Sequence, residues 1–273
     1  MPPIKSKFYH LAGSQVRYLE SGSSQNPSLV LLHAWPATAD MYRPIIENLS
    51  SSFHVLAPDF PGFGLSRSTG QSSYISYTKF VSNFLTAQNL SRVYLCGSSM
   101  GAAIALNFTH QFPHQVKKMV IHAPPINLGV YHQQLYPLLA RLTKHSHLTT
   151  PLINILKGHP CRVYFYLRDR KYHLSLSLVD QIYSTAKHSS PDSIMSLLAE
   201  FITQDLTALA TSISVPTRLL IGQNDHQILQ SDAKKICNLN KNFSLLSIPE
   251  VNHRFSICAP RRFAQAVSGF ILS

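Results

Sequence analysis

The chain is poor in charged residues, and acidic residues are the scarcest of them. Its 273 residues include 12 Asp and Glu against 24 Lys and Arg, and charged residues make up 13% of the total. An average soluble protein has about 25%. Hydrophobic residues make up 45%, which suffices for one large core and excludes a disordered chain. We therefore expect one globular domain that carries a net charge of +12.

Long apolar runs and paired cysteines are also missing. The longest apolar runs, SLVLLHAW and CRVYFYL, are far shorter than the ~20 residues of a membrane-spanning helix, and the first ten residues contain no apolar signal segment. The cysteines form no CxxC pair and no cluster with histidine at metal-ligand spacing: Cys96, Cys161, Cys237 and Cys258. We therefore expect a soluble, cytoplasmic protein without a transmembrane span, a disulfide framework or a metal site.

The cationic residues are scattered, with one denser group in RVYFYLRDRKYH. It contains Arg162, Arg168, Arg170 and Lys171. Such a group could form a solvated basic face, dock an acidic partner or an anionic substrate, or bind single-stranded nucleic acid by stacking on the interleaved aromatic rings. Because a chain short of acids forms such groups by composition alone, we favour the solvated face and expect no nucleic-acid partner.

Short β-type apolar segments alternate with helical segments along most of the chain. We expect a hairpin over 8–22, strands over 28–34, 53–59, 92–97, 116–123, 217–225 and 243–249, and helices over 40–49, 76–90, 101–112, 231–239 and 261–273. Between 125 and 205 the pattern changes to helical segments with prolines. The sequence therefore predicts an α/β fold: a mostly parallel, doubly wound sheet built from 1–124 and 206–273, with 125–205 as a helical cap insertion.

The segment GSSMG, residues 97–101, places two serines between two glycines where a predicted strand meets a predicted helix. In this setting the pattern G-x-S-x-G selects Ser99 as a nucleophile, with Ser98 as a neighbour that points elsewhere. So sharp a turn strains the serine backbone and leaves no room for side chains two residues away, where Gly97 and Gly101 stand. The helix N-terminus then favours negative charge on the attacked oxygen.

A nucleophilic serine needs a base, and the base needs a carboxylate that fixes its tautomer. Among fourteen histidines, His253 lies between the last predicted strand and the last helix, so its loop reaches the same edge of the sheet as Ser99. Asp225 follows the preceding strand and gives the order Ser, Asp, His that this topology uses. Asp205 precedes its strand, Glu250 is too near His253 in sequence to orient it easily, and a simple turn-forming role for Asp225 is the alternative.

The oxyanion of a tetrahedral intermediate needs N–H donors, each of which lowers the barrier by roughly 3 kcal/mol. The backbone N–H of Met100, one residue past the serine, is the first candidate. The second is expected in the loop His33-Ala34-Trp35-Pro36, which follows a predicted strand. We assign it to the N–H of Trp35 and expect the His33 ring to brace the loop.

Five segments, LLHAWP, APDFPGFGLS, LCGSSMGA, LLIGQND and PEVNHRFSI, span residues 28–259. In this order and at these separations the chain resembles serine hydrolases of the α/β-hydrolase fold, especially capped esterases and acyl hydrolases. That family usually has glycine where Ala34 stands. If the position needs a positive φ, alanine costs about 1 kcal/mol and shifts the Trp35 donor. Serine rather than aspartate at the elbow argues against the epoxide-hydrolase and dehalogenase branches.

The resemblance implies covalent acyl transfer. Ser99 attacks a carbonyl with His253 as base, water later cleaves the acyl-enzyme, and neither a metal nor an organic cofactor is needed. An ester or thioester is the expected substrate, a carbon–carbon bond cleaved by the same triad is the second possibility, and a non-catalytic binding member of the fold is the third. A cap that is apolar beneath and cationic outside would suit an acyl chain borne by an acidic carrier protein.

Overall fold

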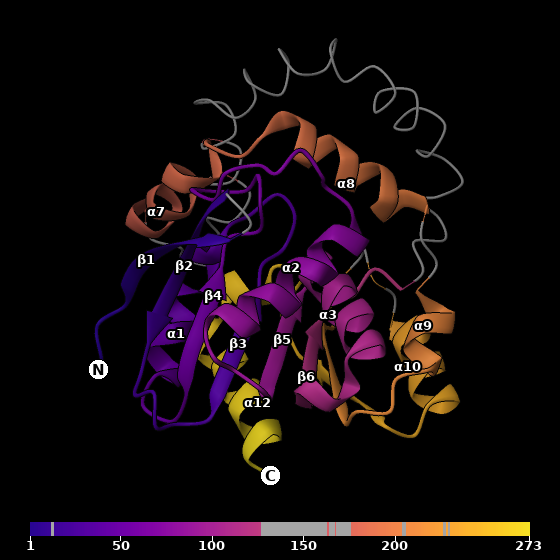
Figure 1. Cartoon of the computed structure of the whole chain (residues 1–273). Helices are drawn as coiled ribbons and strands as arrows, with labels where there is room; N and C mark the ends of the chain where they lie inside the picture. The colour runs from indigo at the N-terminus through magenta and orange to yellow at the C-terminus, as the bar shows by residue number, and fades with distance from the viewer. Residues whose placement is uncertain are drawn as a thin grey trace.

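Eight strands form a single sheet at the centre of the molecule (Figure 1). The computed structural model describes residues 1–11, 14–126, 176–203, 206–225 and 230–273, together with Val163, Leu167 and Ile228. The strands are β1 Lys5–Leu11, β2 Ser14–Ser21, β3 Ser28–Leu32, β4 His54–Pro58, β5 Val93–Ser98, β6 Val116–His122, β7 Thr217–Gly222 and β8 Phe243–Ile248. Their order across the sheet is β1-β2-β4-β3-β5-β6-β7-β8.

Most of the sheet is parallel. β1 and β2 form an antiparallel hairpin, and β2 pairs antiparallel with β4, whereas each pair from β4 to β8 is parallel. The central strands are continuous apolar runs because helices cover both of their faces. In β3, successive side chains point to opposite faces of the sheet, and both faces are buried. Val30 and Leu32 belong to one core cluster, and Leu29 and Leu31 belong to the other.

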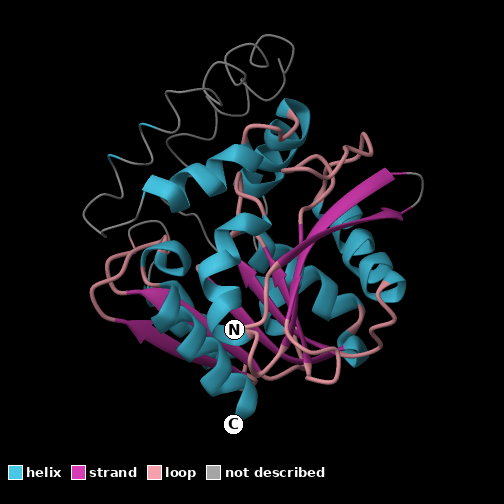
Figure 2. Ribbon diagram, turned by 90° about the vertical axis from the view of Figure 1, so that its left-hand side faces the viewer, coloured by secondary structure: helices cyan, strands magenta, loops and turns pink. Residues whose placement is uncertain are grey.

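Each of the two core clusters lies between the sheet and its own layer of helices. The first cluster includes side chains of α2 (Tyr74–Ala87), α3 (Met100–Gln111), α9 (Thr207–Thr211) and α10 (Gln230–Leu239). The second includes those of α1 (Arg43–Leu49), α11 (Phe255–Cys258) and α12 (Pro260–Leu272). Figure 2 shows helices on both sides of the twisted sheet. The doubly wound α/β architecture expected from the sequence is therefore confirmed.

Two further helices lie above the end of the sheet at which the parallel strands finish (Figure 1). They are α7 (Leu176–Ala186) and α8 (Pro191–Thr203). The connection between them is bonded to the core loop beneath it: Ser190 N–H donates to the Gly62 carbonyl at 2.7 Å, and Gly64 N–H donates to the Ser189 hydroxyl at 3.0 Å. A separate cap unit over 125–205 stays a prediction, since residues 127–175, apart from Val163 and Leu167, lie outside the described residues.

Element boundaries differ locally from those expected. The helix expected over 40–49 is divided into a 3-10 helix, Ala39–Tyr42, and α1, which has a proline in its first turn. α2 begins earlier than expected, because the Ser73 hydroxyl accepts from the Ser76 N–H and Ser76 bonds back to the Ser73 N–H. The short helices α9, α11 and Pro113–Gln115 had too few residues to show a period. No helix in the described ranges has the length and apolar content needed to cross a lipid bilayer.

Candidate active site

The turn between β5 and α3 consists of one residue, Ser99. Its backbone has φ 49° and ψ −112°, a conformation in which a non-glycine residue is strained. A Cβ on Gly97 would collide with the Gly101 carbonyl oxygen, and a Cβ on Gly101 would collide with the carbonyl of Leu32. The two glycines therefore allow β5, α3 and the end of β3 to approach one another closely enough for this turn to form.

The two serines of the segment have different surroundings. The Ser98 hydroxyl is 1% exposed and bonded to the Tyr42 hydroxyl at 2.9 Å and to Nδ1 of His122 at 3.3 Å. Ser99 is 8% exposed, and its N–H donates to the His122 carbonyl at 2.8 Å. The Ser99 hydroxyl forms no hydrogen bond with another described residue. Ser98 is thus held inside the structure, whereas Ser99 has an unengaged hydroxyl on a strained turn.

Asp225 and His253 form a direct pair. Nδ1 of His253 lies 2.9 Å from Oδ2 of Asp225, and because a carboxylate only accepts, Nδ1 carries the proton and Nε2 keeps its lone pair. The Ile228 N–H donates to the other carboxylate oxygen at 3.1 Å. Gly222 permits the close approach of these two loops, because a Cβ there would collide with the Val251 carbonyl.

The pair lies at the same edge of the sheet as Ser99. The His253 ring centroid is 6.3 Å from that of His122, at the end of β6, and His122 pairs with Ser98 and bonds the Ser99 N–H. A hydrogen bond between the Ser99 hydroxyl and His253 is not among the bonds of the described residues. Hydrogen bonds of this kind are often long without substrate and shorten in the complex.

The candidate oxyanion donors come from two elements, the start of α3 and the loop after β3, the strand that pairs with β5. Met100 begins α3, so its N–H has no partner within the helix. The Trp35 N–H has no acceptor among the described residues. Nδ1 of His33 lies 3.0 Å from the Ala34 carbonyl, and its Nε2 accepts the Phe60 N–H at 3.1 Å. Burial lowers the pKa of His33 to about 4, so a neutral ring joins the loop after β3 to the loop after β4.

Ala34 avoids the strain considered above. Among the described non-glycine residues, positive φ values occur at Asn89, Ser99, Ala123 and Glu250, and Ala34 is not one of them. Alanine therefore carries no left-handed backbone penalty at this position.

Sequence reasoning missed His122. It closes β6, its ring packs against Phe255 and Phe263, and burial lowers its pKa to about 3. Its Nε2 has no hydrogen-bond partner although it is buried. The sequence VKKMVIH contained a signal for it, because this predicted strand is apolar up to a polar last residue and lies next to the strand that leads to Ser99. Only acidic residues were considered as partners of the base, so a histidine at this position was passed over.

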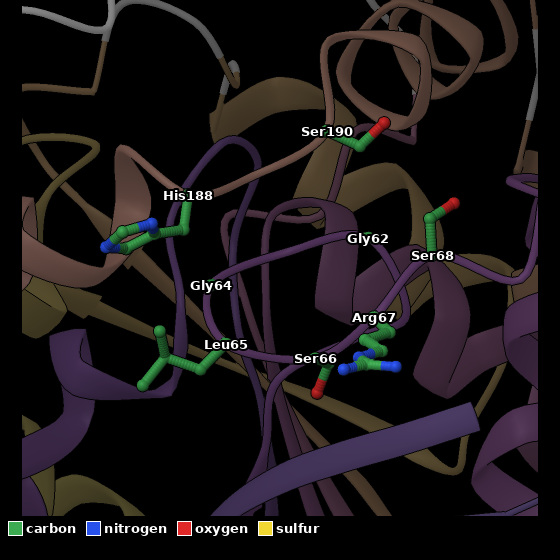
Figure 3. A pocket seen from close by; sticks show the side chains of 8 residues that line it. All are labelled: Gly62, Gly64, Leu65, Ser66, Arg67, Ser68, His188 and Ser190. Atoms are coloured by element: carbon green, nitrogen blue, oxygen red, sulfur yellow. The ribbon is translucent and has the colours of Figure 1, made fainter.

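A cavity of about 280 Å³ is lined by residues other than the candidate catalytic ones. It is bounded by the loop after β4 and the α7–α8 connection (Figure 3): Gly62, Gly64, Leu65, Ser66, Arg67, Ser68, His188 and Ser190. In Figure 3 the side chains of Arg67, His188 and Ser190 point in different directions, so they do not converge on one ligand. The basic group Arg162, Arg168, Arg170 and Lys171 lies outside the described residues.

Residues 27–255 match a family described as alpha/beta hydrolase fold. The chain belongs to this family and is an enzyme of the hydrolase class. A solved structure titled E-2-(Acetamidomethylene)succinate Hydrolase has a TM-score of 0.81 at 16% identity, over 99% of this chain and 100% of that one. At that identity the likeness supports the fold alone.

Three curated relatives match parts of the chain. An uncharacterized hydrolase of Saccharomyces cerevisiae is 28% identical over 44% of this chain and 43% of its own length. A pimeloyl-[acyl-carrier protein] methyl ester esterase of Nitrosomonas europaea is 30% identical over 37% and 38%. A 2-hydroxy-6-oxo-2,4-heptadienoate hydrolase of Pseudomonas putida is 31% identical over 41% and 42%. Each match spans less than half of the relative.

Proposed function

We propose that this hydrolase cleaves a carboxylic ester or a thioester through an acyl-enzyme on Ser99. The observation that carries the proposal is the Asp225–His253 pair, 2.9 Å apart, at the edge of the sheet where Ser99 occupies a strained turn. An oriented base with a free Nε2, at the same edge of the sheet as an unengaged serine hydroxyl, supplies the parts required for nucleophilic catalysis.

The mechanism assigns one step to each group. Nε2 of His253 takes the Ser99 proton as the hydroxyl oxygen attacks the substrate carbonyl, and Asp225 stabilises the imidazolium that forms. The N–H groups of Trp35 and Met100 donate to the oxyanion. His253 then gives its proton to the leaving group, and it later activates the water that releases the acid.

Apolar residues in contact with the site residues favour a substrate with an apolar acyl part. Ile194 accepts the Trp35 indole N–H, Ile228 donates its N–H to Asp225, and both side chains belong to the core cluster that contains Met100. An acyl group carried by an acidic protein is the more specific candidate, supported by the activity for which the Nitrosomonas europaea relative is named. In that case the basic group 162–171 would dock the carrier. The cytoplasmic location expected from the sequence likewise stays a prediction.

Cleavage of a carbon–carbon bond by the same triad is the second candidate function. It is supported by the Pseudomonas putida relative, which is named as a hydrolase of a dienoate with a 6-oxo group. Turnover of a vinylogous diketone without turnover of simple esters would favour it over the ester hydrolase. The hydrolase names of the three relatives described above argue against the third possibility, a binding protein without activity.

The deciding experiment is labelling with a fluorophosphonate, followed by a substrate panel. Wild type and Ser98→Ala should label, whereas Ser99→Ala should not. Asp225→Asn should lower kcat by about 10⁴-fold, because the histidine tautomer is then wrong. p-Nitrophenyl esters of graded length, an acyl-pantetheine thioester, a carrier-linked methyl ester and the diketone rank the substrate classes. Labelling that survives in Ser99→Ala and disappears in Ser98→Ala would refute the assigned nucleophile.

A further inference from the structure

The loop that carries the Trp35 N–H is held from the core side at its first residue. The Ala34 carbonyl accepts the Ala37 N–H at 2.8 Å, which closes a turn around Trp35 and Pro36. The same carbonyl lies 3.0 Å from Nδ1 of the His33 ring, which is anchored at Phe60. Pro36 has no N–H to donate. The bonds from the core to this turn therefore go through Ala34, its first residue.

The far side of the turn is held by the helices above the sheet. The indole Nε1–H of Trp35 donates to the Ile194 carbonyl of α8 at 3.0 Å, a contact between residues 159 positions apart. Further along the loop, the Thr185 hydroxyl of α7 donates to Oδ2 of Asp40 at 2.7 Å and lies 2.9 Å from the Thr38 hydroxyl. The segment 35–40 is therefore bonded to both described helices of the insertion.

An oxyanion donor is effective only when its N–H lies within hydrogen-bond distance of the developing charge, and small displacements reduce the rate steeply. Only two rotatable bonds separate the Trp35 backbone from its indole, and the ring packs against the core cluster, so a shift of α8 acts on the backbone donor through the ring. α8 also forms a hydrogen bond with a loop that carries no candidate oxyanion donor: the Ser72 hydroxyl donates to the Ser193 hydroxyl at 2.8 Å.

We propose that the Trp35 indole couples the position of α8 to the oxyanion hole, so that the hole is complete only when the helices over the sheet are in place. The inference rests on the proposed function. It makes the Trp35 side chain a positioning residue that acts through the backbone N–H of the same residue, with Thr185 in the same role at the other end of the segment.

The chain offers a direct test because Trp35 is its single tryptophan. Replacing all tryptophan with 3-benzothienylalanine exchanges one N–H for sulfur at this position alone and keeps the ring shape. We expect the rate of fluorophosphonate acylation, and kcat for p-nitrophenyl acetate, to fall about tenfold. KM should stay within twofold, because the backbone donor acts on the transition state.

A matched control lies one residue from the coupled carbonyl. Ser193→Ala removes the hydroxyl bond between α8 and Ser72 and should leave acylation within twofold of wild type. Thr185→Val is the second variant. It should slow acylation severalfold and shift the Trp35 fluorescence to longer wavelength, because the segment loses one of its two attachments to the helices.

The outcomes separate this inference from the proposed function. If wild type labels at Ser99 while the benzothienylalanine protein and Thr185→Val label at the wild-type rate, the coupling is wrong and the hydrolase assignment stands. The coupling would also be wrong if the acylation rate fell as far in Ser193→Ala as in the benzothienylalanine protein and Thr185→Val. Any loosening of α8 would then slow acylation, whether or not it acts through Trp35. Wild type that does not label would remove the proposed function and the coupling with it.

Discussion

At the scale of single residues, the candidate site depends on positions that have no side chain. Gly101 faces the carbonyl oxygens of Leu32 and His33, with no flexible side chain to move aside. Gly269, in α12, has no atom within 4 Å of an added Cβ. A Gly→Ala substitution would therefore be crowded by backbone atoms at Gly101 but would have open space at Gly269.

Gly101→Ala is expected to destabilise the protein by about 1–3 kcal/mol, the usual cost of overpacking, and to slow labelling of Ser99 at least tenfold. Gly269→Ala should instead raise the unfolding free energy by up to about 1 kcal/mol, since alanine is the better helix former. Urea unfolding and fluorophosphonate labelling measure both effects. An unchanged labelling rate in Gly101→Ala would show that the elbow is not as closely packed as the structure has it.

At the scale of elements, a buried ion cluster joins β2 to the loops after β3 and β4. Arg17, 2% exposed, donates to both oxygens of Asp40, at 2.6 and 2.9 Å, and to Asp59 at 3.2 Å. Although burial alone would raise the pKa of Asp40, the hydrogen bonds from Arg17 hold it below its ordinary value. Burial raises the pKa of Asp59, which also accepts the Ala39 and Leu65 N–H groups.

Removing the guanidinium leaves one buried carboxyl group without a cation and the other with Arg43 alone, so Arg17→Met should lower the unfolding free energy by about 3–5 kcal/mol. The control is on the same hairpin: Lys7 pairs with Glu20 while 44% of its side chain is exposed, and Lys7→Met should cost less than about 1 kcal/mol. Urea unfolding at pH 7 compares the two variants. Equal losses would mean that the cluster does not join these elements as inferred.

At the scale of the whole molecule, two buried neutral histidines make stability depend on pH. Burial lowers the pKa of His33 to about 4 and that of His122 to about 3, whereas an unfolded histidine has a pKa of about 6.5. Below pH 6.5 the unfolded chain therefore binds more protons than the folded chain. Stability is fully present above that pH and is lost as the pH falls toward the folded-state pKa values.

Between pH 7 and pH 5 each histidine should remove about 2 kcal/mol of unfolding free energy. The raised pKa of Asp59 acts in the opposite direction, so the comparison of wild type with His122→Gln isolates one histidine. Urea unfolding at both pH values should show about 2 kcal/mol less acid destabilisation in His122→Gln. Identical pH dependence in the two proteins would contradict a neutral buried His122.

Local patterns sufficed to predict much of the fold. Short apolar runs located every strand of the sheet, because both faces of a parallel sheet must be apolar, and helical spacing located the longer described helices of the core. Short helices such as α11 and the division of the helix over 40–49 were not predicted, since a single turn has no period. For the site, glycine spacing and position after a strand sufficed to select Ser99, Asp225 and His253.

The amino-acid sequence alone determined the α/β alternation, the glycine-flanked elbow and the order of the three candidate catalytic residues, because these depend on neighbours within a few positions. Tertiary structure alone decided that Trp35 bonds Ile194, that Arg17 is enclosed by Asp40 and Asp59, and that His122 lies beside His253. Such pairs join residues that are far apart along the chain. Their partners are set by how the strands are ordered and how the helices pack, which no local spacing encodes.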